Sequence, residues 1–572
     1  MTAPWYRHYE EGVPHSIDYP DVSLADLLDQ AAERTPDKIA LRFYVNPSLP
    51  AATMTYAALR EATRRFATAL DGLGVKQNDR VAIMLPNSIQ YVVAFYGALR
   101  LGAIVVNTNP LYVPREMKHQ FSDSGAETVV LLNAFWPRLE EIWDDTPVKR
   151  AIVVDIASPF SWPFRTLIRM VQKRHGEYVK PPRRPDVFDF DALIDRYPPL
   201  PPTVSIDPHD VCLFQYTGGT TGVPKAAMLT HRNLVANTMQ ISAWFTRAEP
   251  QNEILMAAIP FFHVYGMTTC MIYGLYQSFE VVMLPRPRPV DNVMKLLQKT
   301  RTTLFPGVPT LYTAINNHPD VQKYDLSSIK ACLSGAAPLP LEVQQTFERL
   351  TGGRLVEGYG LTEAAPVTHC NPLFGTRKEG SIGVPFPDVE ARIVDIESGK
   401  DQPPGQEGEL VVRGPQVMKG YWNRPDETAA TIRDGWLFTG DMARMDEDGF
   451  FYIVDRKKDI IIASGFNILP REVEEVLYQH PKVLEAVVAG IPDPYRGETV
   501  KAYIVLKEGE TATAEEIIAY CKENLAAYKV PTAVEFRSEL PKTLVGKILR
   551  RVLVEEEIKK QQQQQGAGDE GA

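Results

Sequence analysis

The sequence is poor in cysteine, has no excess of basic residues and contains no long apolar run. Its five cysteines are odd in number and widely spaced, and no two of them form a C-x-x-C pair. We therefore expect neither a disulfide framework nor a zinc site. A net charge of -10 lacks the basic field that a general nucleic-acid binder needs, so no nucleic-acid partner is expected.

The lack of long apolar runs argues against a membrane span. No stretch of about 18 uninterrupted apolar residues occurs, and the polar N-terminus lacks the charged-then-apolar pattern of a secretory signal. We expect a cytoplasmic location. With 572 residues, of which 44% are hydrophobic and 23% charged, the chain has the composition of a globular protein that is too long for a single core.

Short apolar runs alternate with helical stretches in the first part of the chain. Residues 81–85 and 104–107 flank a helical stretch from Ser88 to Leu101, which is the strand, helix, strand order of a parallel sheet. Similar runs recur at residues 128–132, 150–154 and 211–215. The pattern predicts an α/β fold with a large N-terminal body of several subdomains.

Smaller units follow after Asp455. Apolar runs at 459–463, 486–490 and 502–506 alternate with helical stretches from Pro470 and near Glu515, which predicts a smaller α+β C-terminal domain. The charged run VDRKKD between the two is either a solvated turn or a hinge. We predict a domain at 1–454, a hinge at 455–459, a mobile C-terminal domain at 460–555 and a disordered tail at 556–572, because five glutamines and GAGDEGA offer nothing to bury.

The densest motif is YTGGTTGVPK, Tyr216 to Lys225. Its glycines allow backbone N–H groups to approach a phosphate, and its threonines and lysine add hydroxyls and charge. A Walker loop is excluded because Val223 and Pro224 separate Gly222 from the lysine. An ordinary glycine-rich turn remains the alternative. The candidate phosphate-binding residues are Thr217, Gly218, Gly219, Thr220, Thr221, Gly222 and Lys225.

Seven further motifs stand in order along the chain: PFFHVYG (260–266), LSGAAPL (333–339), EGYGLTE (357–363), FTGD (438–441), VDRKKD (454–459), SGFNI (464–468) and LPKTLVGKILRR (540–551). With the glycine-rich loop, they resemble the acyl-adenylate-forming superfamily, and within it the bacterial long-chain fatty acid CoA ligases. The resemblance covers nearly all of the chain. It implies that ATP activates a fatty acid as its adenylate, that Mg²⁺ assists, and that the acyl group passes to coenzyme A.

The resemblance also implies roles for single residues. A flat aromatic and small residues suit a purine slot, which would be formed by Glu357, Gly358, Tyr359, Gly360, Gly335 and Ala336. The ribose would contact Asp441 and Arg456, although a surface ion pair is the alternative for these two. The resemblance implies that Thr362 contacts the α-phosphate, and that Glu363 and Thr217 bind Mg²⁺, a hard cation that prefers oxygen ligands. A structural glutamate is the alternative for Glu363.

In the same family, a C-terminal lysine contacts the acyl carboxylate and the α-phosphate, which here is Lys547. Its charge would stabilise the meeting of two anions. Lys458 would occupy the hinge and Gly465 the coenzyme A path. His263 would shape the acyl site, with a satisfied core histidine as the alternative. A medium-chain or aromatic acid ligase and a non-catalytic acyl or nucleotide carrier remain alternative functions.

Residues 159–184 reverse the charge of this acidic protein, because seven basic side chains and one acidic side chain give them a net charge of +6. Within this segment, Phe164, Leu167, Ile168 and Val171 follow helical spacing, and Trp162 lies just upstream. The composition is typical of an interfacial helix and predicts peripheral contact with an anionic membrane. A surface helix docked on its own domain is the alternative.

Overall fold

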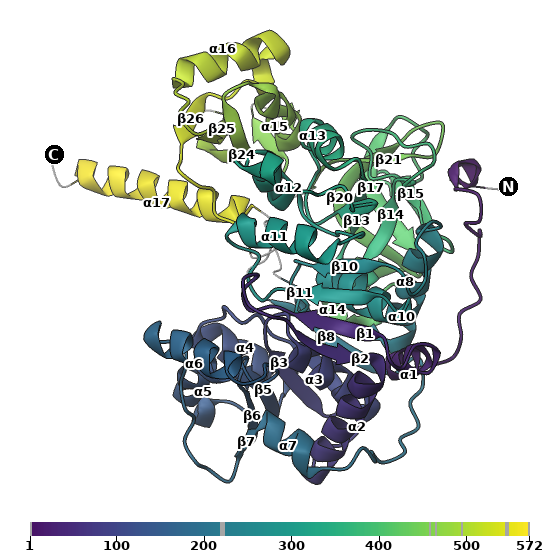
Figure 1. Ribbon diagram of the computed structural model, residues 1–572. Helices are drawn as coiled ribbons and strands as arrows, with labels where there is room; N and C mark the ends of the chain where they lie inside the picture. The colour runs from purple at the N-terminus through teal and green to yellow at the C-terminus, as the bar shows by residue number, and fades with distance from the viewer. Residues whose placement is uncertain are drawn as a thin grey trace.

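The computed structural model describes residues 3–217, 224–456, 459–463, 466–493, 496–543 and 548–569. Figure 1 shows a large N-terminal α/β body and a smaller C-terminal α+β domain above it, which confirms the predicted fold class. Among the described residues, no helix is both long and apolar enough to cross a membrane.

An eight-stranded sheet forms the base of the N-terminal body within the described residues. Its strands from β8 to β7 are parallel, as expected for strands that helices connect, and β9 and β18 extend one edge in antiparallel fashion. The order across the sheet is β18 (Gly420–Tyr421), β9 (Lys225–Thr230), β8 (Val211–Thr217), β4 (Ile104–Asn107), β3 (Arg80–Met84), β5 (Thr128–Leu132), β6 (Arg150–Val154) and β7 (Val187–Asp189).

Two further sheets share the N-terminal body, and isolated parallel bridges through Leu304 link them. The first has the order β10 (Ile254–Ala257), β11 (Glu280–Met283), β1 (Ile39–Phe43) and β2 (Ala52–Thr55). The second has the order β12 (Ala331–Ser334), β13 (Arg354–Gly360), β14 (Val367–Cys370) and β15 (Val384–Pro385).

An antiparallel sheet leads from the N-terminal body to the C-terminal domain. It has the order β16 (Glu390–Val394), β17 (Glu407–Arg413), β20 (Trp436–Met445) and β19 (Ile432–Arg433), and β21 (Phe451–Arg456) pairs with β20. The C-terminal sheet has the order β23 (Phe466–Ile468), β22 (Ile461–Ala463), β25 (Gly497–Leu506) and β24 (Val483–Asp493), and β26 (Ala533–Phe536) pairs with β25.

Helices cover these sheets, and many begin at a side-chain cap. Ser23 and Asp26 form a capping box at the start of the first α-helix. The α-helices are α1 (Leu24–Arg34), α2 (Tyr56–Gly72), α3 (Ile89–Arg100), α4 (Pro114–Ser124), α5 (Trp136–Glu141), α6 (Phe164–Arg174), α7 (Phe190–Arg196), α8 (His231–Trp244), α9 (Val264–Gly266), α10 (Tyr273–Tyr276), α11 (Val290–Thr300), α12 (Pro309–Asn316), α13 (Leu341–Thr351), α14 (Pro425–Thr431), α15 (Pro470–Gln479), α16 (Ala514–Asn524) and α17 (Arg550–Asp569).

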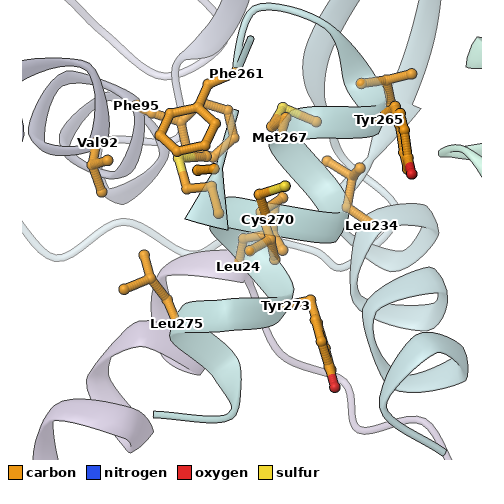
Figure 2. Close-up of a cluster of buried hydrophobic side chains, with 14 of the residues drawn as sticks. Leu24, Val92, Phe95, Leu234, Phe261, Tyr265, Met267, Cys270, Tyr273 and Leu275 are labelled. Carbon is orange, nitrogen blue, oxygen red and sulfur yellow. The ribbon is translucent and has the colours of Figure 1, made fainter. Parts of the chain in front are cut away.

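A buried helical segment runs through the N-terminal body from α9 through a π-helical stretch, η4 (Met267–Ile272), to α10. Figure 2 shows its side chains Met267, Cys270, Tyr273 and Leu275 packed among residues of α1, α3 and α8. Every residue from Val264 to Leu275 is buried, as expected for a helix without a solvent face. It fixes the position of the PFFHVYG motif at its N-terminal end.

The C-terminal helix α17 differs from the prediction. Residues 556–572 are expected to be disordered, whereas helix α17 runs from Arg550 to Asp569. The first half of the helix is anchored, because Leu553 is fully buried and Lys501 Nζ pairs with Glu557 Oε2 at 2.7 Å. A helix nucleated in this way extends readily through lysine and glutamine, which are good helix formers.

Candidate active site

A cleft of about 3140 Å³ is lined by residues of both the N-terminal body and the C-terminal domain. Every candidate residue that the structure describes lines this one cleft: Thr217, Lys225, His263, Gly335, Ala336, Glu357, Gly358, Tyr359, Gly360, Thr362, Glu363, Asp441 and Arg456. The other candidates lie outside the described residues: Gly218, Gly219, Thr220, Thr221, Gly222, Lys458, Gly465 and Lys547. The sequence motifs therefore meet in space although they are far apart in the chain.

The two ends of the glycine-rich motif lie in a hairpin. Thr217 at the end of β8 is the register partner of Lys225 at the start of β9. The Lys225 ammonium pairs with Glu427 and lies 4.9 Å from the centre of the Tyr421 ring. A cation over an aromatic face is held electrostatically, so this lysine is oriented from two sides.

Glu363 lies one turn after β13, in the short helix Thr362–Ala364. Its Oε1 accepts a hydrogen bond of 2.7 Å from the hydroxyl of Tyr421, on the edge strand β18. This bond fixes one oxygen of the carboxylate. A carboxylate and the Thr217 hydroxyl are oxygen donors of the kind that Mg²⁺ prefers. Within the described ranges, no group of three or more His, Cys, Asp or Glu residues could hold a metal ion by itself.

Asp441 has partners on both of its oxygens. The Tyr359 hydroxyl donates to Oδ2 at 2.6 Å, and Arg456 Nε lies 3.4 Å from Oδ1. The arginine reaches it because Asp441 on β20 and Arg456 on β21 are register partners. Burial, and then the Asp441 carboxylate, raise the pKa of Tyr359 far above its usual range, so the phenol remains a donor.

Packing by itself requires small residues in the predicted purine slot. A Cβ atom on Gly360 would lie 2.0 Å from the carbonyl oxygen of Pro366, and one on Gly335 would lie 3.1 Å from the Tyr265 ring. No side chain fits at Gly360 without movement of the backbone. The glycine of the EGYG motif at this position therefore has a structural reason that is independent of any ligand.

Glu357 is a buried carboxyl group in the middle of β13. Burial raises its pKa to about 7, and the nearby cation of Arg471, on α15 of the C-terminal domain, works in the opposite direction. A carboxyl group with a pKa near neutrality thus faces the C-terminal domain. The sequence motif contains this glutamate but gives no sign of its titration.

His263 caps the buried helical segment. Its Nδ1 accepts from the backbone N–H of Tyr265 at 3.2 Å, and the Tyr265 hydroxyl donates to the carbonyl of Leu333 at 2.7 Å. A ring nitrogen that accepts a hydrogen bond carries no proton, so Nδ1 serves to orient the ring.

The junction between the two domains is tied by buried polar contacts. Asp455 accepts from the backbone N–H of Arg471 at 2.9 Å, and Arg471 Nη1 donates to the carbonyl of Ile453 at 2.6 Å. The two contacts fix the start of α15 against β21. Burial raises the pKa of Asp455 to about 6.

A second tie involves Arg550, at the start of α17. Its guanidinium lies 2.7 Å from Asp459 Oδ2 and 2.7 Å from Glu474 Oε1. Arg550 thus links the end of the LPKTLVGKILRR motif to Asp459, the last residue of the predicted hinge. The sequence motifs predict no role for Tyr421, Arg471 or Arg550. Arg550 lies within the LPKTLVGKILRR motif, whereas Tyr421 has no local signal.

The fold and the cleft define a nucleotide-binding α/β enzyme with a separate C-terminal domain. The chain belongs to the AMP-binding enzyme family: residues 28–422 match that family, and residues 472–547 match the AMP-binding enzyme C-terminal domain.

Among its relatives, a long-chain-fatty-acid–CoA ligase of Bacillus subtilis is 48% identical, over 97% of this chain and 98% of that protein. One of Escherichia coli is 43% identical, again over 97% and 98%. The solved structure of an anthranilate CoA ligase in complex with anthranoyl-AMP has a TM-score of 0.83 at 27% identity, and the match covers 94% of this chain and 97% of that one.

Proposed function

We infer that this protein is an ATP-dependent long-chain fatty acid CoA ligase. The fatty acid carboxylate displaces pyrophosphate from ATP to give an acyl-adenylate, and the thiol of coenzyme A then displaces AMP to give acyl-CoA. The observation that carries this inference is that the described candidates from six motifs line one cleft, in a chain 48% identical to a long-chain-fatty-acid–CoA ligase over nearly its full length.

We propose that the nucleotide lies across β13. Tyr359 and the small residues Gly335 and Ala336 would enclose the adenine. The Asp441 carboxylate would accept from the ribose hydroxyls, with Arg456 beside it. Support comes from Tyr359 and Arg456, which already orient this carboxylate from two sides. A preoriented acceptor loses little entropy on binding.

The phosphates would lie over the hairpin of β8 and β9. Thr362 would contact the α-phosphate and Lys225 would contribute charge. Glu363 and Thr217 would hold Mg²⁺, which would neutralise phosphate charge and so favour attack at the α-phosphorus. Tyr421 supports this role because its hydroxyl fixes one carboxylate oxygen of Glu363. An ionised fatty acid needs no general base, and Lys547 would stabilise the two anions as they meet.

Residues 460–555 would rotate about a hinge at 455–459 between the two half-reactions, with Lys458 absorbing the change in backbone angles. Adenylation needs Lys547 inside the cleft, whereas thioester formation needs a path for the thiol beside Gly465. The contacts of Arg471 with Asp455 and with the carbonyl of Ile453 support this arrangement, because polar contacts between domains are compatible with relative domain motion.

The acyl chain would occupy the apolar part of the cleft beyond His263. Leu132, Ile156, Leu167 and Val171 are among the apolar residues that line the cleft. A long apolar chain is stabilised by such a lining in proportion to the area that it buries. A medium-chain or aromatic acid ligase is the alternative within the same chemistry.

Formation of CoA thioesters from a series of acids tests this assignment. Purified protein would be incubated with ATP, Mg²⁺, coenzyme A and saturated acids from short to long, together with benzoate and ferulate. We expect the highest kcat/KM with long-chain acids, and AMP and pyrophosphate as coproducts. A maximum with aromatic or medium-chain acids would contradict the chain-length assignment, and no thioester with any acid would contradict the function.

A further inference from the structure

Helix α6 is attached to the N-terminal body along a narrow strip. Ile168 is only 3% exposed, and Arg169 Nε lies 2.5 Å from Asp155 Oδ2, just after β6. Two large apolar side chains point elsewhere: Met170 is 58% exposed, and Trp162, just before the helix, is 82% exposed. In Figure 1, α6 lies at the rim of the N-terminal body, on the left. Apolar groups of this size, gathered on one exposed element, mark an interaction surface.

Several basic residues follow these apolar residues in the sequence. Arg174, Lys180 and Arg183 are exposed, and in the described part of the protein none of them forms an ion pair. Glu177 is the one acidic residue between 159 and 184, and its carboxylate already pairs with Arg286 Nη2 at 3.0 Å. The segment thus presents uncompensated positive charge in a protein with a net charge of -10.

The same helix forms a wall of the cleft. Leu167, Ile168 and Val171 line the cleft, whereas Met170 and Trp162 do not. Leu167 and Val171 are 41% and 47% exposed, which is the surface that an acyl chain in the cleft could cover. One side of α6 therefore borders the cleft, and the apolar and basic groups of its other sides face solvent.

We propose that residues 162–184, the α6 surface, dock on an anionic phospholipid bilayer, and that the fatty acid passes from the bilayer into the cleft beside α6. Trp162 and Met170 would enter the boundary between headgroups and acyl chains, and the cations would lie among the anionic headgroups. A polyanion such as RNA offers the charge but no apolar phase, so the exposed tryptophan and methionine favour the bilayer. The entry route rests on the proposed function, whereas docking does not.

The role of the cations in docking is tested by cosedimentation with phosphatidylcholine vesicles, with and without phosphatidylglycerol. The variant carries Arg174→Glu, Lys180→Glu and Arg183→Glu. Arg169 stays unchanged because it holds the helix to Asp155. The matched control reverses three exposed lysines elsewhere, Lys295, Lys400 and Lys522. Each lost charge weakens partition about fivefold, so the α6 variant should bind anionic vesicles roughly 100-fold more weakly, and the control should bind like wild type.

The role of the apolar side chains in docking is tested with the double variant Trp162→Ala and Met170→Ser. The control is Leu200→Ser with Ile396→Ser, which changes two apolar residues elsewhere that are 70% and 43% exposed. We expect at least about tenfold weaker binding for the first pair and no change for the second. The proposal is overturned if wild type binds neutral vesicles equally well, or if both charge-reversed triples behave alike. It is also overturned if the Trp162 and Met170 pair binds normally while RNA competes, because that result identifies a polyanion partner.

Turnover tests the entry route. Acyl-CoA formation would be measured with oleate supplied in anionic vesicles and with oleate supplied on serum albumin. The α6 variants should lose several-fold in rate with vesicles and keep the wild-type rate with albumin. The entry route would be overturned if the α6 variants kept the wild-type rate with oleate in vesicles as well as with oleate on albumin. Lack of turnover in wild type with both would reject the proposed function and leave the vesicle-binding result intact.

Discussion

Tyr421→Phe removes a single hydroxyl from the cleft. That hydroxyl donates at 2.7 Å to Glu363 Oε1, and the ring remains under Lys225 at 4.9 Å. Tyr421 is 8% exposed, so its phenyl group keeps its packing. A hydrogen bond to a charged group contributes about 1.5 kcal/mol or more, so kcat/KM for ATP should fall by about 10-fold or more. If Glu363 binds Mg²⁺, the Mg²⁺ concentration for half-maximal rate should rise as well.

The assay is pyrophosphate release with oleate and coenzyme A, measured over a series of ATP concentrations for kcat/KM and over a series of Mg²⁺ concentrations at saturating ATP. Tyr452→Phe is the matched control, because its hydroxyl donates to Asp446 Oδ2 at 3.1 Å and neither residue lines the cleft. The control should leave the Mg²⁺ dependence unchanged. An unchanged Mg²⁺ dependence in Tyr421→Phe, or an equal shift in both variants, would refute the role assigned to Glu363.

Three further predictions concern the C-terminal domain and the buried carboxyl group. Lys458→Pro, which locks φ at the predicted hinge, should spare adenylate formation and impair thioester formation; equal loss of both half-reactions would argue against a hinge there. Arg550→Met leaves Asp459 and Glu474 without their shared cation and should lower the thermal midpoint by several degrees, and a second change, Glu474→Gln, should recover part of that loss. The pKa of Glu357 is raised from 4.5 to about 7 in the folded state, so the unfolded state ionises first as pH rises. The contribution of Glu357 to stability should therefore fall by roughly 3 kcal/mol between pH 4.5 and pH 7 and stay lower above it, and Glu357→Gln should remove that part of the pH dependence in thermal melts taken across this range.

Much of the fold can be predicted from local patterns. The runs at 104–107, 128–132 and 150–154 coincide with β4, β5 and β6, because buried parallel strands are continuously apolar. Strand pairing is less visible. The hairpin of β8 and β9 places a strand where the sequence shows only the residues after a glycine-rich loop, and the edge strand β18 is two residues long. The pairing of β18 with β9, in which Gly420 is the register partner of Met228, depends on partners that are distant in the chain.

The candidate site divides in a similar way. Residues inside glycine-rich or charged motifs, such as Thr217 and Asp441, can be identified from the sequence, because packing and turn formation alone rarely require motifs of that composition. Tyr421 could not be found, since a tyrosine in an ordinary run acquires its function only through its contact with Glu363, which lies 58 positions away in the chain. The tail at residues 556–572 is a different case. Composition indicates disorder, whereas the anchored start of α17 allows the helix to continue.

Trapping of the adenylate tests the central claim most directly. Purified protein would be incubated with ATP, Mg²⁺ and oleate, without coenzyme A and with hydroxylamine. We predict oleoyl hydroxamate, AMP and pyrophosphate in equal amounts, and a loss of about 100-fold or more in Lys547→Ala, because that change removes the electrostatic stabilisation of the adenylation transition state. Formation of ADP and phosphate, or hydroxamate that requires coenzyme A, would contradict activation of the fatty acid as its adenylate.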